Sequence, residues 1–329
     1  MPKNGAMKTL QARLHAIEQL ATGIQRFEFR PTDEAAWPAV CAGAHVELHL
    51  APRLSRSYSL VNAPGESHRY VVAVQRNATG QGGSRYLHDT LRVGDELQIS
   101  APRNAFPLEE SAAQSILIAG GIGITPLWSM AQRLAQLGRP WTLHYATRTP
   151  ASAAYAEQFV ALAANSLGKV KLYFDGGVSD QGLDLQAIAQ DSPADAHLYC
   201  CGPAGMLQAF EAATAQLPPA RVHREYFAAP PAPAQDAKNT DQAFSVRLSQ
   251  SGRLLPVRND TSILEALLDA GVDVPYSCMS GICGMCTTGV LGGIPDHRDH
   301  VLSDAEKACG QQIILCCSRA KSPELVLDL

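Results

Sequence analysis

The feature that most constrains this chain is a loop, CMSGICGMCTTG, in which three cysteines and three glycines occur between Cys278 and Gly289. The spacing is Cys278-x4-Cys283-x2-Cys286, and two adjacent cysteines, Cys316 and Cys317, follow thirty positions later. Two irons bridged by sulfide need four terminal thiolates, and plant-type [2Fe–2S] sites have the spacing C-x4-C-x2-C…C. Glycines in such a loop permit unusual dihedral angles and keep side chains away from the cluster. The spacing therefore predicts a [2Fe–2S] cluster whose fourth ligand is one of the two later cysteines.

Other uses of these thiols fit less well. A structural zinc site is typically built from two paired knuckles, and the loop contains only one CxxC. A redox dithiol would use the CxxC pair, Cys283 and Cys286, and would leave Cys278 without a role. Disulfides belong to oxidising compartments, and the N-terminal stretch lacks the apolar core of a signal peptide. We therefore expect a cytoplasmic protein in which Cys41 and Cys309 are ordinary buried or semi-buried thiols.

Charge and apolar runs exclude two classes of partner. The net charge is −4, whereas a nucleic-acid-binding surface would be strongly basic. The longest apolar run, Ile116–Ile124, is far shorter than the about 20 residues that span a bilayer. The chain of 329 residues is long enough for two or three domains. We expect no nucleic acid and no membrane as a partner.

Four segments with different patterns divide the chain. Residues 1–108 combine short alternating or apolar stretches with frequent Pro and Gly, which is typical of an antiparallel β-barrel. Residues 109–227 alternate strands with helices, which predicts an α/β domain with a parallel sheet. Residues 228–243 are rich in Pro and Ala and predict an extended linker. Residues 244–329 return to strands around a short helix, an α+β pattern.

A glycine loop, GGIGITP (120–126), follows a buried strand and precedes a helical pattern. Backbone amides at such a helix start can bind a pyrophosphate. The dinucleotide fingerprint is incomplete because Pro126 stands where its third glycine would be, so a simple strand-to-helix turn remains an alternative. We expect the helix to begin at Pro126 after a Thr125 N-cap and to end at Gly138.

A second small-residue turn, CCGP (200–203), also lies between a strand and a helix. Strand ends of a parallel sheet form one crevice, so this turn is predicted to lie near the glycine loop. We expect Cys200 to pack in the core and Cys201 to face a ligand. Asp175 at another strand end would accept hydrogen bonds from a ribose and favour NADH, whereas Arg148 would favour NADPH.

The all-β segment contains two further candidate motifs, RSYS (56–59) and GQGGS (80–84). Arg56 supplies a permanent planar cation suited to a phosphate, and Tyr58 supplies an aromatic face. The glycines and Ser84 are suited to an amide-lined anion site. Two ordinary turns with a solvated arginine are the alternative interpretation.

Together these motifs resemble the phthalate dioxygenase reductase family. The resemblance spans nearly the whole chain and rests on RSYSL, GQGGS, GGIGITP, CCGP, HREYF, the cysteine loop and the tail CSRAKSPELVLDL. It implies a flavin barrel, then an NAD domain, then a β-grasp ferredoxin at the C-terminus. It also implies FMN rather than FAD, hydride donation by NADH, and Cys316 rather than Cys317 as the fourth cluster ligand.

The resemblance further implies site residues. The catalytic set would be Ser59 at the reactive edge of the flavin, Cys201 in the nicotinamide site and Phe227 near the flavin. The cluster ligands would be Cys278, Cys283, Cys286 and Cys316. The cofactor-binding residues would be Arg56, Ser57, Tyr58, Ser59, Ala73, Val74, Gln75, Gly82, Gly83, Ser84, Gly121, Gly123, Ile124, Thr125, Pro126, Thr147, Arg148, Asp175, Cys201, Gly202, Pro203 and Phe227.

These cofactors define a simple electron path. NADH gives two electrons at once and an iron–sulfur cluster accepts one, so a flavin belongs between them. The family implies a Rieske-type terminal oxygenase, acting on aromatic compounds or as an O-demethylase, as the partner. A cytochrome P450 or other acceptor is one alternative, and a non-catalytic iron–sulfur sensor is another. Residues 244–329 carry ten acidic and seven basic side chains, which predicts either an acidic docking face or a solvated surface.

Overall fold

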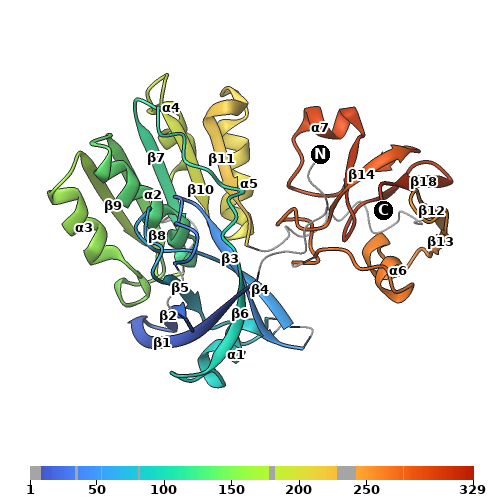
Figure 1. The fold of residues 1–329 in the computed structure, drawn as a ribbon. Helices are drawn as coiled ribbons and strands as arrows, with labels where there is room; N and C mark the ends of the chain where they lie inside the picture. Colours follow the sequence, from blue (N-terminus) through green and yellow to red (C-terminus); the bar gives the residue numbers. More distant parts are fainter. Residues whose placement is uncertain are drawn as a thin grey trace. The chain divides into compact units, whose positions relative to one another are not determined.

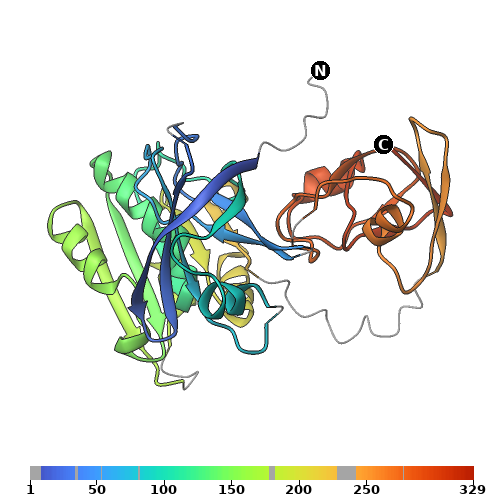
Figure 2. The ribbon, with the colours of Figure 1, turned by 60° about the horizontal axis from the view of Figure 1, so that its bottom comes forward.

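The structure, a computed structural model, describes residues 9–33, 36–52, 54–80, 82–177, 182–227, 242–276 and 278–329, and of Asp304 only the backbone. The chain divides into two compact units, Met1–Phe227 and Ala228–Leu329, which are described separately below (Figures 1 and 2). Most of the predicted linker, 228–243, lies outside the described residues. No helix among the described residues is long and apolar enough to cross a membrane.

The first half of the N-terminal unit is an antiparallel six-stranded sheet in the order β4-β3-β6-β1-β2-β5. An isolated bridge between Leu60 and Val72 joins the two edges, so the sheet closes on itself as a barrel. Helix α1 (Gly83–Asp89) follows β5. The strands are β1 (Thr9–Ala21), β2 (Ile24–Pro31), β3 (His45–Ala51), β4 (Leu54–Ser59), β5 (Tyr70–Gln75) and β6 (Glu96–Ser100).

Alternation along the strands gives the barrel its apolar interior. On β1, Leu10, Ala12 and Leu14 are buried, whereas Gln11 and Arg13 are exposed. This period of two directs every second side chain inward. The barrel interior is completed by side chains of the same kind from the other strands and from α1, among them Phe27, Phe29, Val46, Leu48, Tyr70, Val72, Val74, Leu87 and Ile99.

The second half of the N-terminal unit is a parallel sheet in the order β11-β10-β7-β8-β9. Helices α2 and α3 pack together, as do α4 and α5, and the two pairs cover the two faces of the sheet (Figure 1). The strands are β7 (Ser115–Gly120), β8 (Trp141–Thr147), β9 (Gly168–Phe174), β10 (His197–Cys201) and β11 (Val222–Glu225). The helices are α2 (Ile124–Gln136), α3 (Ala156–Ala164), α4 (Leu185–Gln190) and α5 (Ala204–Thr214).

The start of α2 differs from its predicted position. A single 3₁₀ turn, Gly121–Gly123, runs directly into α2, so the helix begins at Ile124 and its N-cap is Gly123. The Thr125 hydroxyl donates a hydrogen bond to the carbonyl of Ile122 (3.0 Å) instead of capping the helix. The predicted stop is confirmed, since Gly138 has φ 63° just past the helix end.

The C-terminal unit is a five-stranded sheet in the order β13-β12-β18-β14-β16 with helix α6 packed beside β13. Among the described strands of this sheet, β12 and β18 alone pair in parallel. Helix α6 (Ile263–Asp269) opens with a capping box between Ser262 and Glu265. The remaining elements are β12 (Phe244–Leu248), β13 (Leu254–Val257), β14 (Thr287–Gly292), β15 (Pro295–Asp296), α7 (Asp304–Cys309), β16 (Gln312–Ile314), β17 (Arg319–Ala320) and β18 (Glu324–Leu327).

Candidate functional site

The structure brings the two motifs of the barrel together. Arg56 and Tyr58 lie on β4, and the turn at Gly82–Gly83 leads into α1 against them. A Cβ on Gly83 would lie 2.4 Å from Cγ of Arg56 and 3.3 Å from the Tyr58 hydroxyl oxygen. Gly82 has φ 90°, a conformation that side chains rarely adopt. The start of α1 therefore packs directly against the side chains of Arg56 and Tyr58, and Nη1 of Arg56 donates a hydrogen bond to the Ser55 carbonyl (2.7 Å).

The other predicted flavin contacts lie on β5 and differ in exposure. Ala73 and Val74 are buried, the first on the outer face of the barrel and the second inside it. Gln75 is exposed at the end of the strand. The Val74 carbonyl is 2.9 Å from Nε2 of His88 on α1. The side chains of Ala73 and Val74 are thus enclosed, and only Gln75 presents its side chain at the surface.

The two small-residue turns of the parallel sheet also meet. Strands β7 and β10 are neighbours, and Cys201 pairs with Ala119. A Cβ on Gly123 would lie 2.2 Å from the Cys201 carbonyl oxygen, and one on Gly202 would lie 3.2 Å from Cα of Gly120. Only residues without a side chain allow this approach. The two turns thus pack against each other at the carboxyl edge of the sheet, the position where open α/β sheets bind ligands, with Gly121 and Gly202 partly accessible and Pro203 exposed.

Side chains that follow the first turn are buried. Ile124, Thr125 and Pro126 lie in the interior, so they fix the start of α2 rather than present polar atoms. Gly121 has φ 53° and open space at its Cβ position. This turn can therefore approach a pyrophosphate closely through Gly121 and the amides around it.

Thr147, Arg148 and Asp175 lie at the same edge of the sheet. Thr147 pairs with Phe174, and the amide of Asp175 donates to the Thr147 carbonyl (3.3 Å). The Asp175 carboxylate accepts a hydrogen bond from the amide of Gly177 (2.7 Å), while Arg148 is exposed. Asp175, expected to favour NADH, and Arg148, expected to favour NADPH, thus follow the ends of the neighbouring strands β9 and β8.

A contact between the barrel and the parallel sheet joins the two candidate regions. The Ser59 hydroxyl donates a hydrogen bond to Oε2 of Glu225 (3.4 Å), and Glu225 pairs with Cys201 across β10 and β11. Burial raises the pKa of Glu225 to about 8, and the Ser59 hydrogen bond offsets only part of that rise. Phe227, two residues further on, is exposed. Perturbed carboxyl groups of this kind are enriched at functional sites.

Glu225 was not predicted from the sequence, and the Cys201 thiol lies in the core although the sequence predicts that it faces a ligand. Glu225 lies within the segment HREYF, and its position one strand from CCGP was the available signal. Cys200 is buried as predicted, but the Cys201 side chain is equally inaccessible, packed among the apolar residues next to α2. Successive side chains of a strand point to opposite faces of the sheet. Because helices cover both faces of a parallel sheet, the side chains of Cys200 and Cys201 are both buried.

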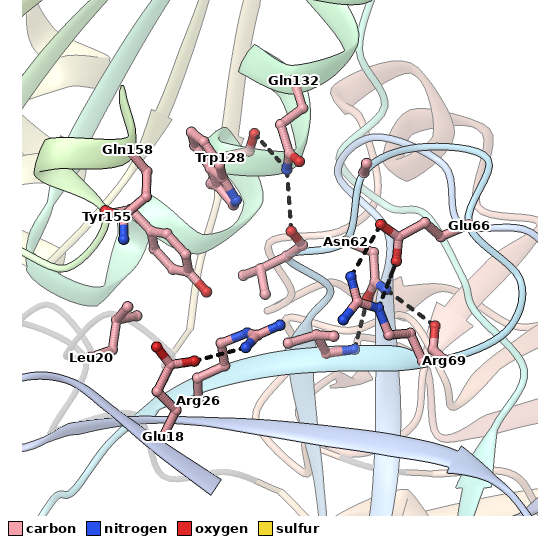
Figure 3. Close-up of a pocket in the computed structure, with 13 residues that line it drawn as sticks. Glu18, Leu20, Arg26, Asn62, Glu66, Arg69, Trp128, Gln132, Tyr155 and Gln158 are labelled. Atoms are coloured by element: carbon pink, nitrogen blue, oxygen red, sulfur yellow. Dashed lines mark hydrogen bonds and ion pairs between the residues drawn. The ribbon is translucent and has the colours of Figure 1, made fainter. Parts of the chain in front are cut away.

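A cleft of about 250 Å³ lies elsewhere in the N-terminal unit (Figure 3). Figure 3 shows Trp128 and Tyr155 on one side and the pair Arg26–Glu18 on the other. The charges at this cleft are matched, with Arg26 2.7 Å from Glu18 and Arg69 3.0 Å from Glu66. None of the predicted site residues lines it. We therefore assign no cofactor to this cleft.

The cysteine loop of the C-terminal unit presents its thiols around a tightly turned backbone. Gly281 and Gly284 both have φ 71°, and Met279 has φ 52°. The amide of Ser280 donates to Sγ of Cys278 (3.4 Å), and that of Gly281 donates to Sγ of Cys316 (3.3 Å). Amide donors directed at sulfur are the usual surroundings of an iron–sulfur cluster.

Two thiols of the loop lie close enough to interact. The hydrogen bond with Cys278 raises the pKa of the Cys283 thiol, as expected when two thiols share a site without a cation. Within the described ranges, no group of three metal-ligating side chains is found. The choice of a [2Fe–2S] cluster over a zinc ion therefore rests on the cysteine spacing, which is that of plant-type clusters.

Cys41 and Cys309 are both exposed, contrary to their predicted burial. Cys309 ends α7, and Cys41 lies in a loop before β3. Neither position is covered by another element. The prediction followed the usual fate of free cysteine, which these surface positions do not share.

Comparison with known proteins defines the class first. A model for oxidoreductase NAD-binding domains matches residues 117–212, and a model for 2Fe-2S iron-sulfur cluster binding domains matches residues 246–321. The chain is therefore an oxidoreductase with an NAD-binding domain and an iron–sulfur domain, which confirms the predicted fold class and activity class.

Relatives over the full length define the family. The chain is 48% identical over 332 residues to the phenoxybenzoate dioxygenase subunit beta of Ectopseudomonas oleovorans, with 100% of both chains covered. The structure of phthalate dioxygenase reductase matches with a TM-score of 0.72 and 40% identity over 98% of both chains. An intact type IV self-sufficient cytochrome P450 monooxygenase matches with a TM-score of 0.86 and 34% identity, covering 98% of this chain and 41% of that chain.

The chain belongs to the phthalate dioxygenase reductase family. This membership confirms the predicted cofactor set of FMN, NADH and a [2Fe–2S] cluster. It also confirms the predicted activity, the transfer of electrons from NADH through the flavin to the cluster.

Proposed function

We propose that this reductase supplies single electrons to a Rieske-type terminal oxygenase that acts on an aromatic compound or as an O-demethylase. The observation that carries the proposal is the full-length likeness to proteins named for such systems, the phenoxybenzoate dioxygenase subunit beta and phthalate dioxygenase reductase. A relative from Pseudomonas, named vanillate O-demethylase oxidoreductase, is 43% identical over 97% of this chain. These relatives share one reductase architecture although their names refer to different oxygenase systems. This is consistent with a reductase that never contacts the aromatic substrate.

The barrel residues would hold the flavin. Arg56 and the amides of Gly83 and Ser84 would bind the FMN phosphate, with Gly82 leaving room for it. Tyr58 and the backbone of Ala73–Gln75 would lie along the ring. When bound, FMN accepts two electrons together and releases them one at a time. Ser59, at the end of β4, would then lie at the reacting edge beside Glu225, from which its hydroxyl is 3.4 Å away.

The strand ends of the parallel sheet would hold NADH. Gly121 and the amides around it would approach the pyrophosphate, with Gly123 allowing close contact between the two turns, and Gly202 and Pro203 would supply the opposite side of the crevice. Asp175 would accept hydrogen bonds from the ribose. Glu225 with its raised pKa would be protonated at neutral pH and so add no negative charge where hydride arrives. The exposed Phe227 would cover the flavin ring until the nicotinamide displaces it.

A cytochrome P450 is the second candidate acceptor. A specific observation favours it, since the self-sufficient P450 monooxygenase contains a region that superposes on 98% of this chain. That region is less than half of the other protein, so its oxygenase part has no counterpart here. The reductase in this case would serve a separate P450 instead of a Rieske protein.

One experiment tests both candidates. The purified protein is first titrated anaerobically with NADH, and flavin and cluster absorbance should both bleach. The reduced protein is then mixed in a stopped-flow instrument with a Rieske oxygenase of the phthalate or vanillate type, or with a bacterial P450. Reoxidation at catalytically competent rates by the Rieske protein alone supports the proposal. Reoxidation by the P450 alone rejects it, and failure of NADH to reduce either centre would support the sensor alternative.

A further inference from the structure

Gly281, in the middle of the cysteine loop, is held on three sides. Its amide donates a hydrogen bond to Sγ of Cys316 (3.3 Å). Its carbonyl accepts one from the amide of His300 (2.9 Å). A Cβ on Gly281 would lie 2.5 Å from Sγ of Cys317, so that thiol occupies the space where a side chain would begin. The two adjacent cysteines thus contact the same glycine in different ways.

The segment that carries His300 is itself firmly anchored. The Asp299 side chain is buried and accepts hydrogen bonds from the amides of Val301 (3.0 Å) and Leu302 (2.7 Å). Lys307 donates to the Asp299 carbonyl (2.7 Å). The amide of Arg298 donates to the hydroxyl of Ser318, the residue after Cys317 (3.2 Å). The loop, the 298–302 segment and the cysteine tail therefore form one connected network.

We propose that Cys317 is a positioning residue for the iron–sulfur centre and not a ligand of it. Its thiol packs on Cα of Gly281 and, with the His300 amide on the other side, keeps the Gly281 amide directed at the sulfur of Cys316. The proposal rests on Cys316 being the fourth ligand, which the first measurement below tests separately.

The expected consequence concerns the reduction potential of the cluster. Reduction adds negative charge to the sulfurs, and an amide hydrogen bond stabilises the more negative form. Removing the Cys317 thiol leaves Gly281, with its positive φ and no side chain, free to turn its amide away. The hydrogen bond then weakens and the potential falls. Because this thiol supplies no bond to iron, the cluster itself remains.

Two alanine variants separate the ligand from the positioning residue. In Cys316→Ala, iron and acid-labile sulfide should be lost. In Cys317→Ala, both should stay at wild-type levels, and the ratio of reduced to oxidised cluster at a fixed potential should fall roughly threefold to tenfold, the equivalent of one weakened hydrogen bond. Pulsed EPR of the reduced cluster should show a weaker coupling to an exchangeable amide proton. The exposed Cys309→Ala in the same unit should change neither quantity.

Cys317→Ser provides the conservative test and remains informative if the alanine variant does not fold. A hydroxyl at the same position restores most of the contact, so its potential should lie between those of the wild type and Cys317→Ala. Loss of iron in Cys317→Ala with retention in Cys316→Ala would reverse the ligand assignment. Intact clusters with an unchanged potential and unchanged proton coupling in both Cys317 variants would overturn the positioning role.

Discussion

The nucleotide edge of the parallel sheet and the cysteine loop of the C-terminal unit are both small-residue sites, yet they are built differently. At the sheet edge, Gly123 contacts the carbonyl of Cys201, a residue 78 positions away, because β7 and β10 are neighbours. In the cysteine loop, three of the four predicted ligands lie within nine residues, between Cys278 and Cys286.

This difference has a physical consequence. The sheet edge depends on the packing of strands and helices, so a change there should affect both folding and binding. The loop depends on local backbone turns and on metal ligation, so a change there should remove the cluster and leave the N-terminal unit intact. The two compact units of the chain make such independence testable.

The largest effect is expected from Cys283→Ser. Loss of one thiolate ligand should abolish the cluster and with it the NADH-dependent reduction of cytochrome c, because the electron path ends at the flavin. Reduction of the flavin by NADH, followed by its absorbance, should continue. Loss of flavin binding in this variant would show that the two sites are not independent.

Gly123→Ala tests the sheet edge by packing. A Cβ at this position would lie 2.2 Å from the Cys201 carbonyl oxygen, a backbone atom of the central sheet. Because that backbone cannot move away, we expect a loss of about 1–3 kcal/mol in the free energy of unfolding and a raised KM for NADH. Thermal unfolding and steady-state kinetics measure the two quantities. Gly205→Ala is the matched control, because its Cβ position within α5 is open and alanine favours a helix. Equal effects of the two substitutions would contradict this account.

Asp175→Asn tests cofactor choice at the same edge. Removing the negative charge that repels a 2′-phosphate should reduce the preference for NADH over NADPH by about tenfold, with Arg148 then able to attract the phosphate. The ratio of kcat/KM for the two cofactors is the measurement. Arg148→Ala should shift the ratio in the opposite direction, and a ratio that neither change affects would remove both residues from the site.

The smallest effect on electron transfer at neutral pH is expected from Glu225→Gln, because glutamine is close in shape and charge to the protonated glutamic acid. The folded pKa of about 8 lies above the ordinary value of 4.5, so the native state binds more protons in between. The contribution of Glu225 to stability is therefore greatest below pH 4.5 and declines as pH rises towards 8. Glutamine cannot titrate, so the melting temperature of the variant relative to wild type should rise from pH 5 to pH 8 and level off above it. A constant difference across this range would show that the pKa is not raised.

Several parts of the site could be predicted because they depend on neighbours in sequence. The thiol spacing, the two glycine turns and the alternation on the barrel strands are local patterns, and each was found where expected. The pairing of Ser59 with Glu225 could not be predicted, because it joins residues 166 positions apart on different sheets. The start of α2 was also misplaced, since a 3₁₀ turn in front of a helix satisfies its first amides without a side-chain cap.

The sequence alone determined which chemistry this protein can hold, since thiol spacing, turn glycines and strand alternation are properties of short segments. Tertiary structure decided which residues meet. It paired Ser59 with Glu225, enclosed the Cys201 thiol, and set Cys317 against Gly281. The physical reason is that these contacts depend on strand order and on close packing between distant segments, which no local pattern of residues encodes.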